Sequence, residues 1–393
     1  MRPARPYPCL PRLLALLLLL AARAAAGEVT VFPAPGPGAV PVQMAPAGPP
    51  QAAPSAADSP MAGGALAAPR LHIYSALDLA LARPLIRGFQ AAHPGVAVVY
   101  EDMLTGEIHD RIVAETDAGG TTADFAFSSA MDLQVKLAND GYARPVIPAE
   151  AEIWPRWAQW RGRLWALTFE PAVFVYNRAA FADQPPPATR DELLRWLDAH
   201  PDEVRGRVGT YDIAQAGAGF LLMARDQEHF ADIWRIFGAL GRAGARVYPT
   251  SGEILERVAD GRLILGYNIL GGYAALWARD HPQVGLALPR DYTVVIARTG
   301  LVPRAAAAPE LGASFLEFLM SEPGQEIMAR ELDLPAVHPR VTGEETAGAL
   351  LTRFGTRLRP VPLGPGLLVY LDAAKRARLT RDWARALAAR PAD

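Results

Sequence analysis

The chain has 393 residues, 51% of them apolar, which is enough to form one large or two medium-sized folded domains. Its formal net charge is only -2, so a general attraction to nucleic acid or to an anionic membrane is not indicated. The single cysteine, Cys9, lies before the apolar segment described next. If that segment is removed on export, disulfides, thiolate nucleophiles and cysteine-ligated metals are excluded.

The N-terminus predicts export. Three arginines precede the apolar run Leu13–Ala22, and three consecutive alanines at 24–26 follow it. This is the layout of a secretory signal peptide, and the run is shorter than the about 20 apolar residues that a membrane-spanning helix needs. We therefore predict a cleaved signal peptide over residues 1–26 and a periplasmic mature protein.

Residues 27–69 are dominated by Ala, Pro and Gly and carry almost no charge. Such a segment buries too little apolar surface to offset the entropy lost on ordering. We predict that it is a disordered spacer.

Strand and helix patterns alternate from Leu71 onward. The expected elements are a strand at 71–75, a helix around 81–89 containing Pro84, a strand at 96–103, a helix at 107–117, a strand at 123–128, a helix at 130–140, an extended segment at 165–176, helices at 190–199, 230–240, 251–260, 312–320 and 322–331, and strands near 262–267 and 292–297. This alternation predicts an α/β fold with parallel sheets in two lobes. We expect an N-terminal lobe of 70–170 plus about 292–331, and a C-terminal lobe of 171–291 plus about 332–393.

Three strand-to-helix junctions share one pattern, in which a hydroxyl residue is followed three positions later by an acid. The pairs are Ser75 with Asp78, Ser129 with Asp132, and Thr250 with Glu253. Each pair fits a capping box, which satisfies free backbone amides of a helix and needs no ligand. However, ligands of parallel α/β sheets bind at the carboxyl ends of strands, and helix N-termini there favour anions. The pattern is consistent with either role.

Further candidate ligand residues lie at or near expected strand ends. Tyr267 and Asn268 end one strand, and the following Gly271-Gly272 permits close backbone approach. The alternative for Tyr267 is a packed tyrosine at the interface between lobes. The remaining candidates are Ala76, Ser128, Thr168, Glu170, Tyr211 and Ser251.

Sequence motifs of catalysis are missing. The chain has no G-x-S-x-G, S-x-x-K, P-loop, G-x-G-x-x-G or H-E-x-x-H pattern, and its histidines lack ligand-like spacing. A tryptophan stripe at 154, 157, 160 and 165 fits a core better than a stacking surface. We expect no enzyme activity, cofactor or metal; a hydrolase of unknown motif is the remaining enzymatic alternative.

Three segments carry a resemblance to a known family: SSAMDLQVKLANDGY at 128–142, EPAVFVYN at 170–177 and LGYNILG at 265–271. From about Leu71 to the neighbourhood of Glu331, the chain resembles extracellular solute-binding proteins of the ferric-iron-binding class, and most closely the branch of phosphoglycerate transport regulatory proteins. The resemblance implies a type II periplasmic-binding-protein fold, whose two lobes close on a ligand in the cleft between them. It also implies a partner, either the permease of an ATP-driven (ABC) importer or the periplasmic part of a sensor kinase.

The same resemblance bears on the ligand. Iron-binding relatives use His, Glu and two adjacent tyrosines; here Asp78 matches the His, Ser129 the Glu and Asn268 the second Tyr, and only Tyr267 is retained. We therefore predict a monomeric solute-binding protein for a small organic anion (a phosphate ester, a phosphonate or a carboxylate), delivered to an ABC importer. A regulatory component read by a sensor histidine kinase and a ferric-iron-binding protein are the alternatives.

Overall fold

The computed structural model describes residues 28–36, 39–44 and 68–388, so the expected signal peptide lies outside the described residues. The strands are β1 (Glu28–Phe32), β2 (Val42–Met44), β3 (Arg70–Ser75), β4 (Ala97–Asp102), β5 (Phe125–Ser128), β6 (Gln159–Trp160), β7 (Leu164–Ala166), β8 (Glu170–Asn177), β9 (Val208–Tyr211), β10 (Arg246–Tyr248), β11 (Leu265–Leu270), β12 (Val284–Ala287), β13 (Thr293–Ile296), β14 (Thr299–Leu301) and β15 (Leu358–Pro360). The helices are α2 (Leu79–Ala92), α3 (Thr105–Asp117), α4 (Met131–Asn139), α5 (Arg190–Ala199), α6 (Pro201–Val204), α7 (Gly217–His229), α8 (Ile233–Arg242), α9 (Ser251–Ala259), α10 (Gly271–Asp280), α11 (Pro309–Met320), α12 (Glu322–Glu331), α13 (Ala347–Phe354) and α14 (Ala373–Leu387).

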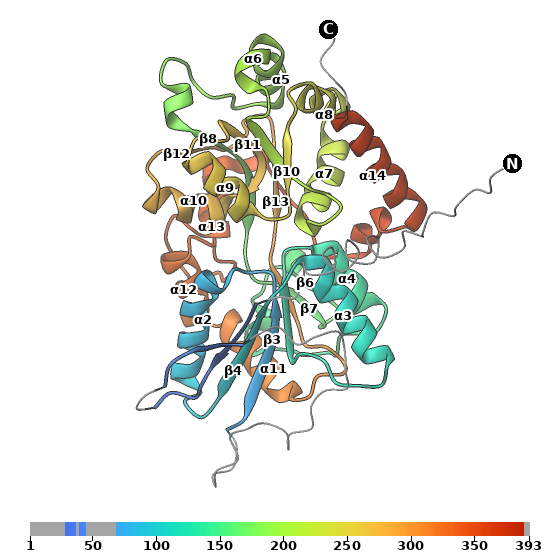
Figure 1. The fold of residues 1–393 in the computed structure, drawn as a ribbon. Coiled ribbons are helices and arrows are strands. Elements are labelled where there is room, and N and C mark those ends of the chain that lie inside the picture. The colour runs from blue at the N-terminus through green and yellow to red at the C-terminus, as the bar shows by residue number, and fades with distance from the viewer. Residues whose placement is uncertain (1–27, 37–38, 45–67, 389–393) are drawn as a thin grey trace, which may run out of the picture.

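The strands form two sheets, one in each half of the molecule (Figure 1). The first has the order β2-β1-β4-β3-β5-β14-β7-β6, and the second has the order β10-β9-β11-β8-β13-β15, with β12 also paired to β8. Strands β3, β4 and β5 are parallel in the first sheet, as are β9, β10 and β11 in the second. The predicted α/β fold with parallel sheets is therefore confirmed, with antiparallel strands added to each sheet.

The chain passes between the two sheets along neighbouring segments. It crosses from β7 to β8 and returns from β13 to β14, and β13 lies antiparallel to β8. A third passage follows α12, where Ala336 forms a bridge with Thr168. Several side-by-side crossings let two lobes move relative to each other while their own packing stays intact.

The second crossing lies later in the chain than expected. The expected boundary at about residue 292 assigns Thr293–Ile296 to the N-terminal lobe, but these residues are β13 of the second sheet. The return to the first sheet occurs at Ala297 and Arg298. The apolar run through 292–297 predicts a strand but carries no signal for which sheet that strand joins.

The prediction of a disordered spacer over 27–69 is wrong for two of its parts. β1 pairs antiparallel with β4 from Glu28 to Phe32, and β2 pairs with β1. Val29 and Phe32 are buried, and Gln90 Nε2 donates to the carbonyl of Pro33 at 3.0 Å. The prediction relied on the average composition of the segment. It therefore overlooked the alternating sequence EVTVF at 28–32, which is a short strand pattern. Residues 45–67 lie outside the described part.

This correction has a direct test. Phe32→Ala should lower the free energy of unfolding by about 3 kcal/mol, because a buried Phe side chain is removed from the apolar core. Val42→Ala on the exposed strand β2 is the control and should change it by less than about 0.5 kcal/mol. Urea unfolding of the mature protein followed by circular dichroism measures both. If both variants change the free energy of unfolding by the same amount, β1 is not paired with β4 in solution.

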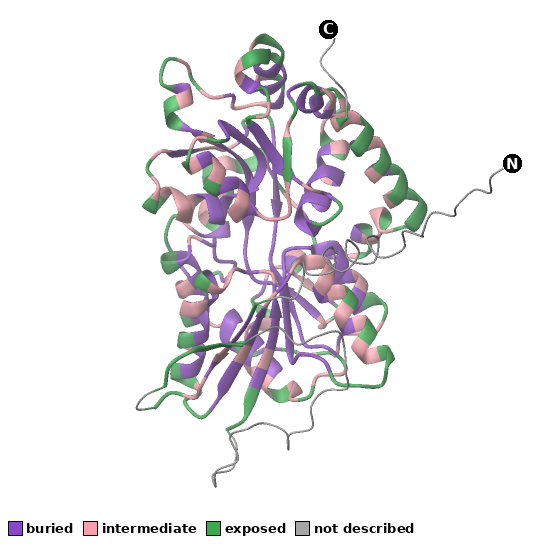
Figure 2. Ribbon diagram, in the orientation of Figure 1, coloured by how far each residue is buried: buried purple, intermediate pink, exposed green. Residues whose placement is uncertain are grey.

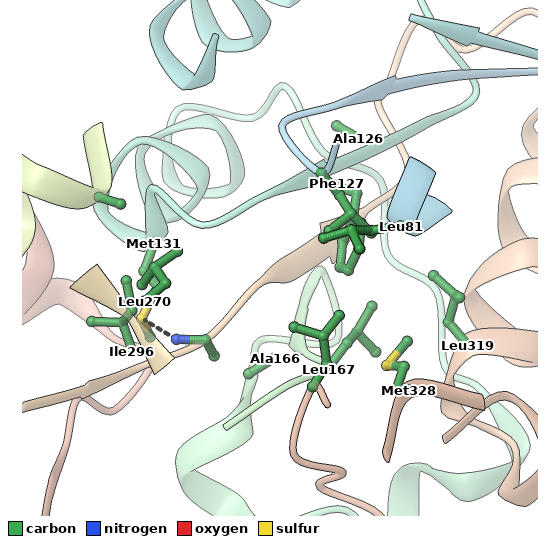
Figure 3. Packing of buried hydrophobic residues seen from close by; sticks show 14 of the residues in the cluster. Leu81, Ala126, Phe127, Met131, Ala166, Leu167, Leu270, Ile296, Leu319 and Met328 are labelled. Carbon is green, nitrogen blue, oxygen red and sulfur yellow. Dashed lines mark hydrogen bonds between the residues drawn. The ribbon is translucent and has the colours of Figure 1, made fainter. Parts of the chain in front are cut away.

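An apolar cluster runs through both lobes, and a second apolar cluster lies within the second lobe. In Figure 2 the buried residues fill the strands of each sheet and the region where the two halves meet. Figure 3 shows the same cluster from close by, with Met131 of α4 beside Leu270 and Ile296 of the second sheet. The backbone N–H of Ala297 donates to Met131 Sδ at 3.3 Å. Helix α4 of the first lobe is thus packed directly against the crossing.

The C-terminal segment spans both lobes. Strand β15 pairs with β13 in the second sheet, and the 3₁₀ turn Pro365–Tyr370 then packs against α4 of the first lobe. Helix α14 lies along α8 on the flank of the upper half in Figure 1. The expected lobe boundaries assigned this segment to the C-terminal lobe alone.

Candidate functional site

A cavity of about 270 Å³ lies between the lobes. It is lined by Ala76, Asp78, Asp102, Met103, Leu104, Thr105, Glu107, Ser129, Tyr211, Ala216, Gly217, Ala218, Pro249, Thr250, Ser251, Leu270, Tyr273 and Arg298. Apart from Arg298, which lies between β13 and β14, these residues lie at or after the carboxyl ends of β3, β4 and β5 in the first sheet and of β9, β10 and β11 in the second. This is the edge at which ligands of parallel α/β sheets bind.

Helix N-termini surround the cavity. The helices that begin at or next to lining residues are α2, α3, α4, α7, α9 and α10. Each N-terminus presents free N–H groups and the positive end of the helix dipole. In α2, α3, α4 and α9 an acid stands at the N-cap or in the first turn, whereas α7 and α10 have none. The two N-termini whose positive dipole ends have no acid beside them, those of α7 and α10, therefore both belong to the second lobe.

Two carboxylates of the first lobe face the cavity. Asp78 is the N-cap of α2, and Asp102 ends β4, where its Oδ2 accepts a hydrogen bond from the N–H of Leu79 at 3.1 Å. Burial, followed by repulsion from Asp78, raises the pKa of Asp102 to about 7. Burial likewise raises the pKa of Asp78, against the opposing effect of Arg298. Within the described residues, neither carboxylate has a Lys or Arg nitrogen within 4.0 Å.

Arg298 is the cationic side chain of the cavity and is only 1% exposed. Its Nη1 donates to the carbonyl of Ala76 at 2.9 Å, and its Nε lies 3.3 Å from Glu170 Oε1. No partner for Nη2 is found among the described residues. Although burial by itself lowers the pKa of Arg298, Tyr273, Glu170 and Asp78 raise it. The side chain remains charged and has one nitrogen to offer a ligand.

The second lobe contributes hydroxyl groups. Tyr211 at the end of β9 shares a hydrogen bond with Ser251 of α9, and burial raises the pKa of Tyr211 to about 12. Thr250 caps α9 by accepting from the N–H of Glu253 at 3.2 Å. The Tyr211 and Ser251 groups remain neutral donors and acceptors at physiological pH.

Hydrogen bonds across the cleft hold the two lobes together. The N–H of Asp78 donates to the hydroxyl of Tyr273 at 3.1 Å, and the N–H of Gly217 donates to Thr105 Oγ1 at 2.9 Å. A Cβ on Gly217 would lie 2.6 Å from the Cβ of Ala130, which is shorter than real contacts of this kind. The lobes are therefore in direct contact beside the cavity, and this arrangement requires glycine at the start of α7.

The structure brings five of the eleven expected ligand residues to the cavity. They are Ala76, Ser129, Tyr211, Thr250 and Ser251. Ser75, Ser128, Thr168 and Glu170 lie behind the lining and support it. Thr168 Oγ1 donates to Glu170 Oε1 at 2.7 Å and accepts from the N–H of Arg298 at 2.7 Å, so both residues hold Arg298 in place.

Tyr267 and Asn268 are not at the cavity. Both donate to Asp226, which also pairs with Arg190 Nη2 at 2.7 Å and accepts from the hydroxyl of Tyr292 at 2.7 Å. A β-bulge interrupts β11, and Asn268 adopts a φ of 60°. Regular strand alternation would point the two side chains to opposite faces, and the bulge turns both toward Asp226.

Two of the three expected capping boxes are wrong. The N-cap of α2 is Asp78, and Ser75 Oγ accepts instead from the N–H of Leu77 at 3.1 Å. The N-cap of α4 is Ala130, whose N–H donates to Ser128 Oγ at 3.2 Å. In both cases the hydroxyl closes a local turn before the helix starts. The third box is half right, since Thr250 caps α9 as expected.

Three polar residues that line the cavity, Asp102, Arg298 and Tyr273, were not among the expected ligand residues. Asp102 ends β4, Arg298 lies two residues after β13, and Tyr273 lies in the first turn of α10. A search for acids and bases at the ends of the expected strands 96–103 and 292–297 would have found the first two. Tyr273 had no such signal, because α10 itself was not expected.

The donor set gives little support to a metal site. In the part of the chain that the structure describes, no three His, Cys, Asp or Glu side chains are arranged to hold a metal ion. Of the residues matched to ferric-iron ligands, Asp78 and Ser129 line the cavity, whereas Tyr267 and Asn268 belong to the Asp226 network. The four positions therefore do not converge.

Comparisons with known proteins agree with this architecture. Residues 85–346 match the model of the bacterial extracellular solute-binding proteins. The chain belongs to this family. A solved structure described as the substrate-binding protein of the ABC transporter from Agrobacterium tumefaciens is 55% identical, covers 93% of this chain and 99% of its own, and has a TM-score of 0.82. A comparison with curated proteins finds no match.

More distant relatives share the type II periplasmic-binding-protein fold. AfuA from Actinobacillus pleuropneumoniae, with fructose-6-phosphate bound, is 16% identical, covers 81% of this chain and 98% of its own, and has a TM-score of 0.68. Iron-bound HitA from Pseudomonas aeruginosa is 18% identical, covers 80% of this chain and 99% of its own, and has a TM-score of 0.64. None of these matches confirms the branch of phosphoglycerate regulatory proteins.

Family membership supplies the coarse function. Solute-binding proteins of this family bind a small molecule outside the cytoplasm, in the periplasm, and have the permease of an ABC transporter as partner. Within residues 28–36, 39–44 and 68–388, no helix is both long enough and apolar enough to cross a bilayer.

Proposed function

We propose that this protein captures a small organic solute in the cavity between its lobes, closes on it, and presents the closed form to the permease of an ABC importer. The cavity and its cross-cleft hydrogen bonds carry the proposal. Residues of both lobes form the lining, so the site is complete only when the lobes meet. A solute that contacts both lobes binds the closed form better than the open form and shifts the population toward it.

The solute carries an anionic group that lies toward the second lobe and the crossing. Arg298 Nη2 and the N-termini of α7 and α10 supply the positive potential there. Ser251 and Tyr211 add neutral hydrogen-bond donors. This arrangement suits a carboxylate, a phosphate ester or a phosphonate, all of which accept several hydrogen bonds.

The solute is small. Pockets for drug-sized ligands measure roughly 300–1,000 Å³, and this cavity of about 270 Å³ lies below that range. Its apolar lining from Met103, Leu104, Pro249 and Leu270 leaves room for a short carbon chain between the polar ends. The ligand is therefore of the size of an amino acid or a small metabolite.

The closure step is tested at Gly217. Gly217→Ala should weaken solute binding by about 1–3 kcal/mol, or about 5- to 150-fold, because its Cβ meets Ala130 and Thr105 only when the lobes are closed. Isothermal titration measures the affinity, and small-angle X-ray scattering measures the decrease in radius of gyration on solute addition.

Gly348→Ala is the matched control, since Gly348 also lies at the start of a helix but faces open space. It should bind the solute as the wild type does. Unchanged affinity and compaction in Gly217→Ala would contradict closure around this cavity.

A further inference from the structure

We propose that the solute also carries a protonated amine, held between Asp78 and Asp102, so that the protein is a receptor for small zwitterions. This inference rests on the proposed function and narrows it to one substrate class. It predicts an orientation as well: the amine faces the first lobe, and the anionic group faces Arg298 and the second lobe.

The balance of charges in the cavity is the first argument. Arg298 is already paired with Glu170, which is buried behind the lining. Asp78 and Asp102 then remain without a cationic partner within 4.0 Å among the described residues. Glu107 adds a third carboxylate at the rim, although it is used to cap α3 through the N–H of Leu104 at 3.0 Å. A purely anionic solute would add negative charge to a partly buried site that already has an excess of it, which is costly.

The presence of both signs of charge in one cavity is the second argument. Asp78, Asp102 and Glu107 all come from the β3–α2 and β4–α3 junctions of the first lobe. The cavity's buried cation, Arg298, lies at the crossing, and its Nη2 has no protein partner in the described part of the chain. Arg298 also donates to the carbonyl of Ala76, two residues before Asp78. The cavity thus holds a cation with one unpartnered nitrogen and, near it, two carboxylates without a partner. A zwitterion offers each of them a group of opposite charge.

The raised pKa values of Asp78 and Asp102 also support an amine-binding site between them. The pKa of Asp102 is raised to about 7 by burial and by Asp78, with Glu28 of β1 acting in the same direction and Arg298 and the N–H of Leu79 opposing them. Glu107, the hydroxyl of Tyr273 and, beside Asp102, the hydroxyl of Tyr100 are further polar groups near the two acids. An ammonium group between the acids favours their ionised forms and lowers both pKa values. Binding of the amine therefore releases a proton near neutral pH.

The experiment is isothermal titration of the mature protein with three matched probe sets. The first set contains α-amino acids and ω-amino acids of three to six carbons, the second their N-acetyl derivatives, and the third the dianions 3-phosphoglycerate and succinate. We expect a member of the first set to bind and its N-acetyl derivative to bind at least about tenfold more weakly, because acetylation removes the positive charge.

Asp102→Asn is the matched variant, since its amide oxygen can still accept from Leu79. It should weaken binding of the zwitterion at least about tenfold. Asp110→Asn on the exposed side of α3 changes the same charge away from the cavity and should leave the affinity unchanged. Thermal unfolding of each variant without solute checks that the fold is intact.

The pH dependence provides a second readout. Because Asp102 must lose its proton to hold the amine, the affinity of the wild type should rise as the pH is raised from about 5.5 to 8, through the pKa of about 7. In Asp102→Asn this rise should be smaller by about half or more, since one of the two proton-binding acids is gone.

The failures of the two proposals are distinguishable. If a dianion binds best and Asp102→Asn strengthens its binding, the solute-receptor function stands and the zwitterion assignment is wrong. If Asp102→Asn and Asp110→Asn bind the zwitterion equally well, the assignment is also wrong. If no probe binds and scattering shows no compaction with any of them, the proposed function fails, and the inference fails with it.

Discussion

Arg298→Met should lower the free energy of unfolding by about 3–5 kcal/mol in the absence of any solute. The substitution keeps an apolar stem of similar length but removes the guanidinium that lies 3.3 Å from Glu170. Glu170 is fully buried, so its carboxylate would be left with the hydroxyl of Thr168 as its polar partner. Urea unfolding at pH 7.5, followed by circular dichroism, measures the loss.

Two further variants distinguish the effect of losing the ion pair on stability from the effect of altered packing. The double variant Arg298→Met with Glu170→Gln should regain more than half of the loss, because no charge is then buried alone. Arg330→Met removes an exposed pair with Glu326 and should change stability by less than about 1 kcal/mol. A loss below about 1 kcal/mol for Arg298→Met would show that water reaches Glu170, contrary to its full burial in the structure.

Asp226→Asn should lower the free energy of unfolding by about 3–5 kcal/mol, because Asp226 is the acceptor for four donors in the second lobe. Arg190 and Asp226 are both completely buried, and the hydroxyls of Tyr267 and Tyr292 donate to the same carboxylate. An amide has one acceptor oxygen and brings two donors of its own, so it cannot replace the carboxylate. Asp291, 3.3 Å from Arg190, supplies only part of the missing charge.

Tyr267→Phe tests the hydrogen bonds to Asp226 at a residue that was expected to bind the ligand. It removes one hydrogen bond and should cost about 1 kcal/mol of stability. Solute affinity should stay within about twofold of the wild type, because Tyr267 does not line the cavity. A loss of affinity of more than about tenfold would return Tyr267 to the ligand site and overturn its structural role.

Much of the fold could be predicted because local patterns are strong in this chain. The strand at 71–75 and the helix at 190–199 coincide almost entirely with β3 and α5, since buried strands and one-sided helices leave a period in the sequence. α7 was missed because most of its residues are buried on several faces, which removes the one-sided pattern. Strand β1 was missed because its five residues stand inside a segment whose average composition indicates disorder.

The candidate site was predicted in part, and for a physical reason. Ala76, Ser129 and Thr250 were expected because chain polarity alone places the residue after a parallel strand at the binding edge of the sheet. Tyr267 was expected at a strand end, but β11 continues through a bulge to Leu270, and Tyr267 donates to Asp226 instead. A bulge depends on pairing with a distant strand and leaves no reliable local signal.

The sequence by itself determined the α/β class, the strand ends at which a ligand could bind, and the resemblance to solute-binding proteins. These follow from hydrophobic period, chain direction and motif, which are all local. The tertiary structure decided which polar residues meet. It brought Asp78, Asp102 and Arg298 to one cavity, and it buried Glu170 beside Arg298 and Asp226 beside Arg190. Glu170 and Arg298 are far apart in the chain and meet at the crossing, whereas Arg190 and Asp226, 36 positions apart, meet inside the second lobe. Such pairs form only when distant segments pack, so the chemistry of the cavity is a property of the folded chain.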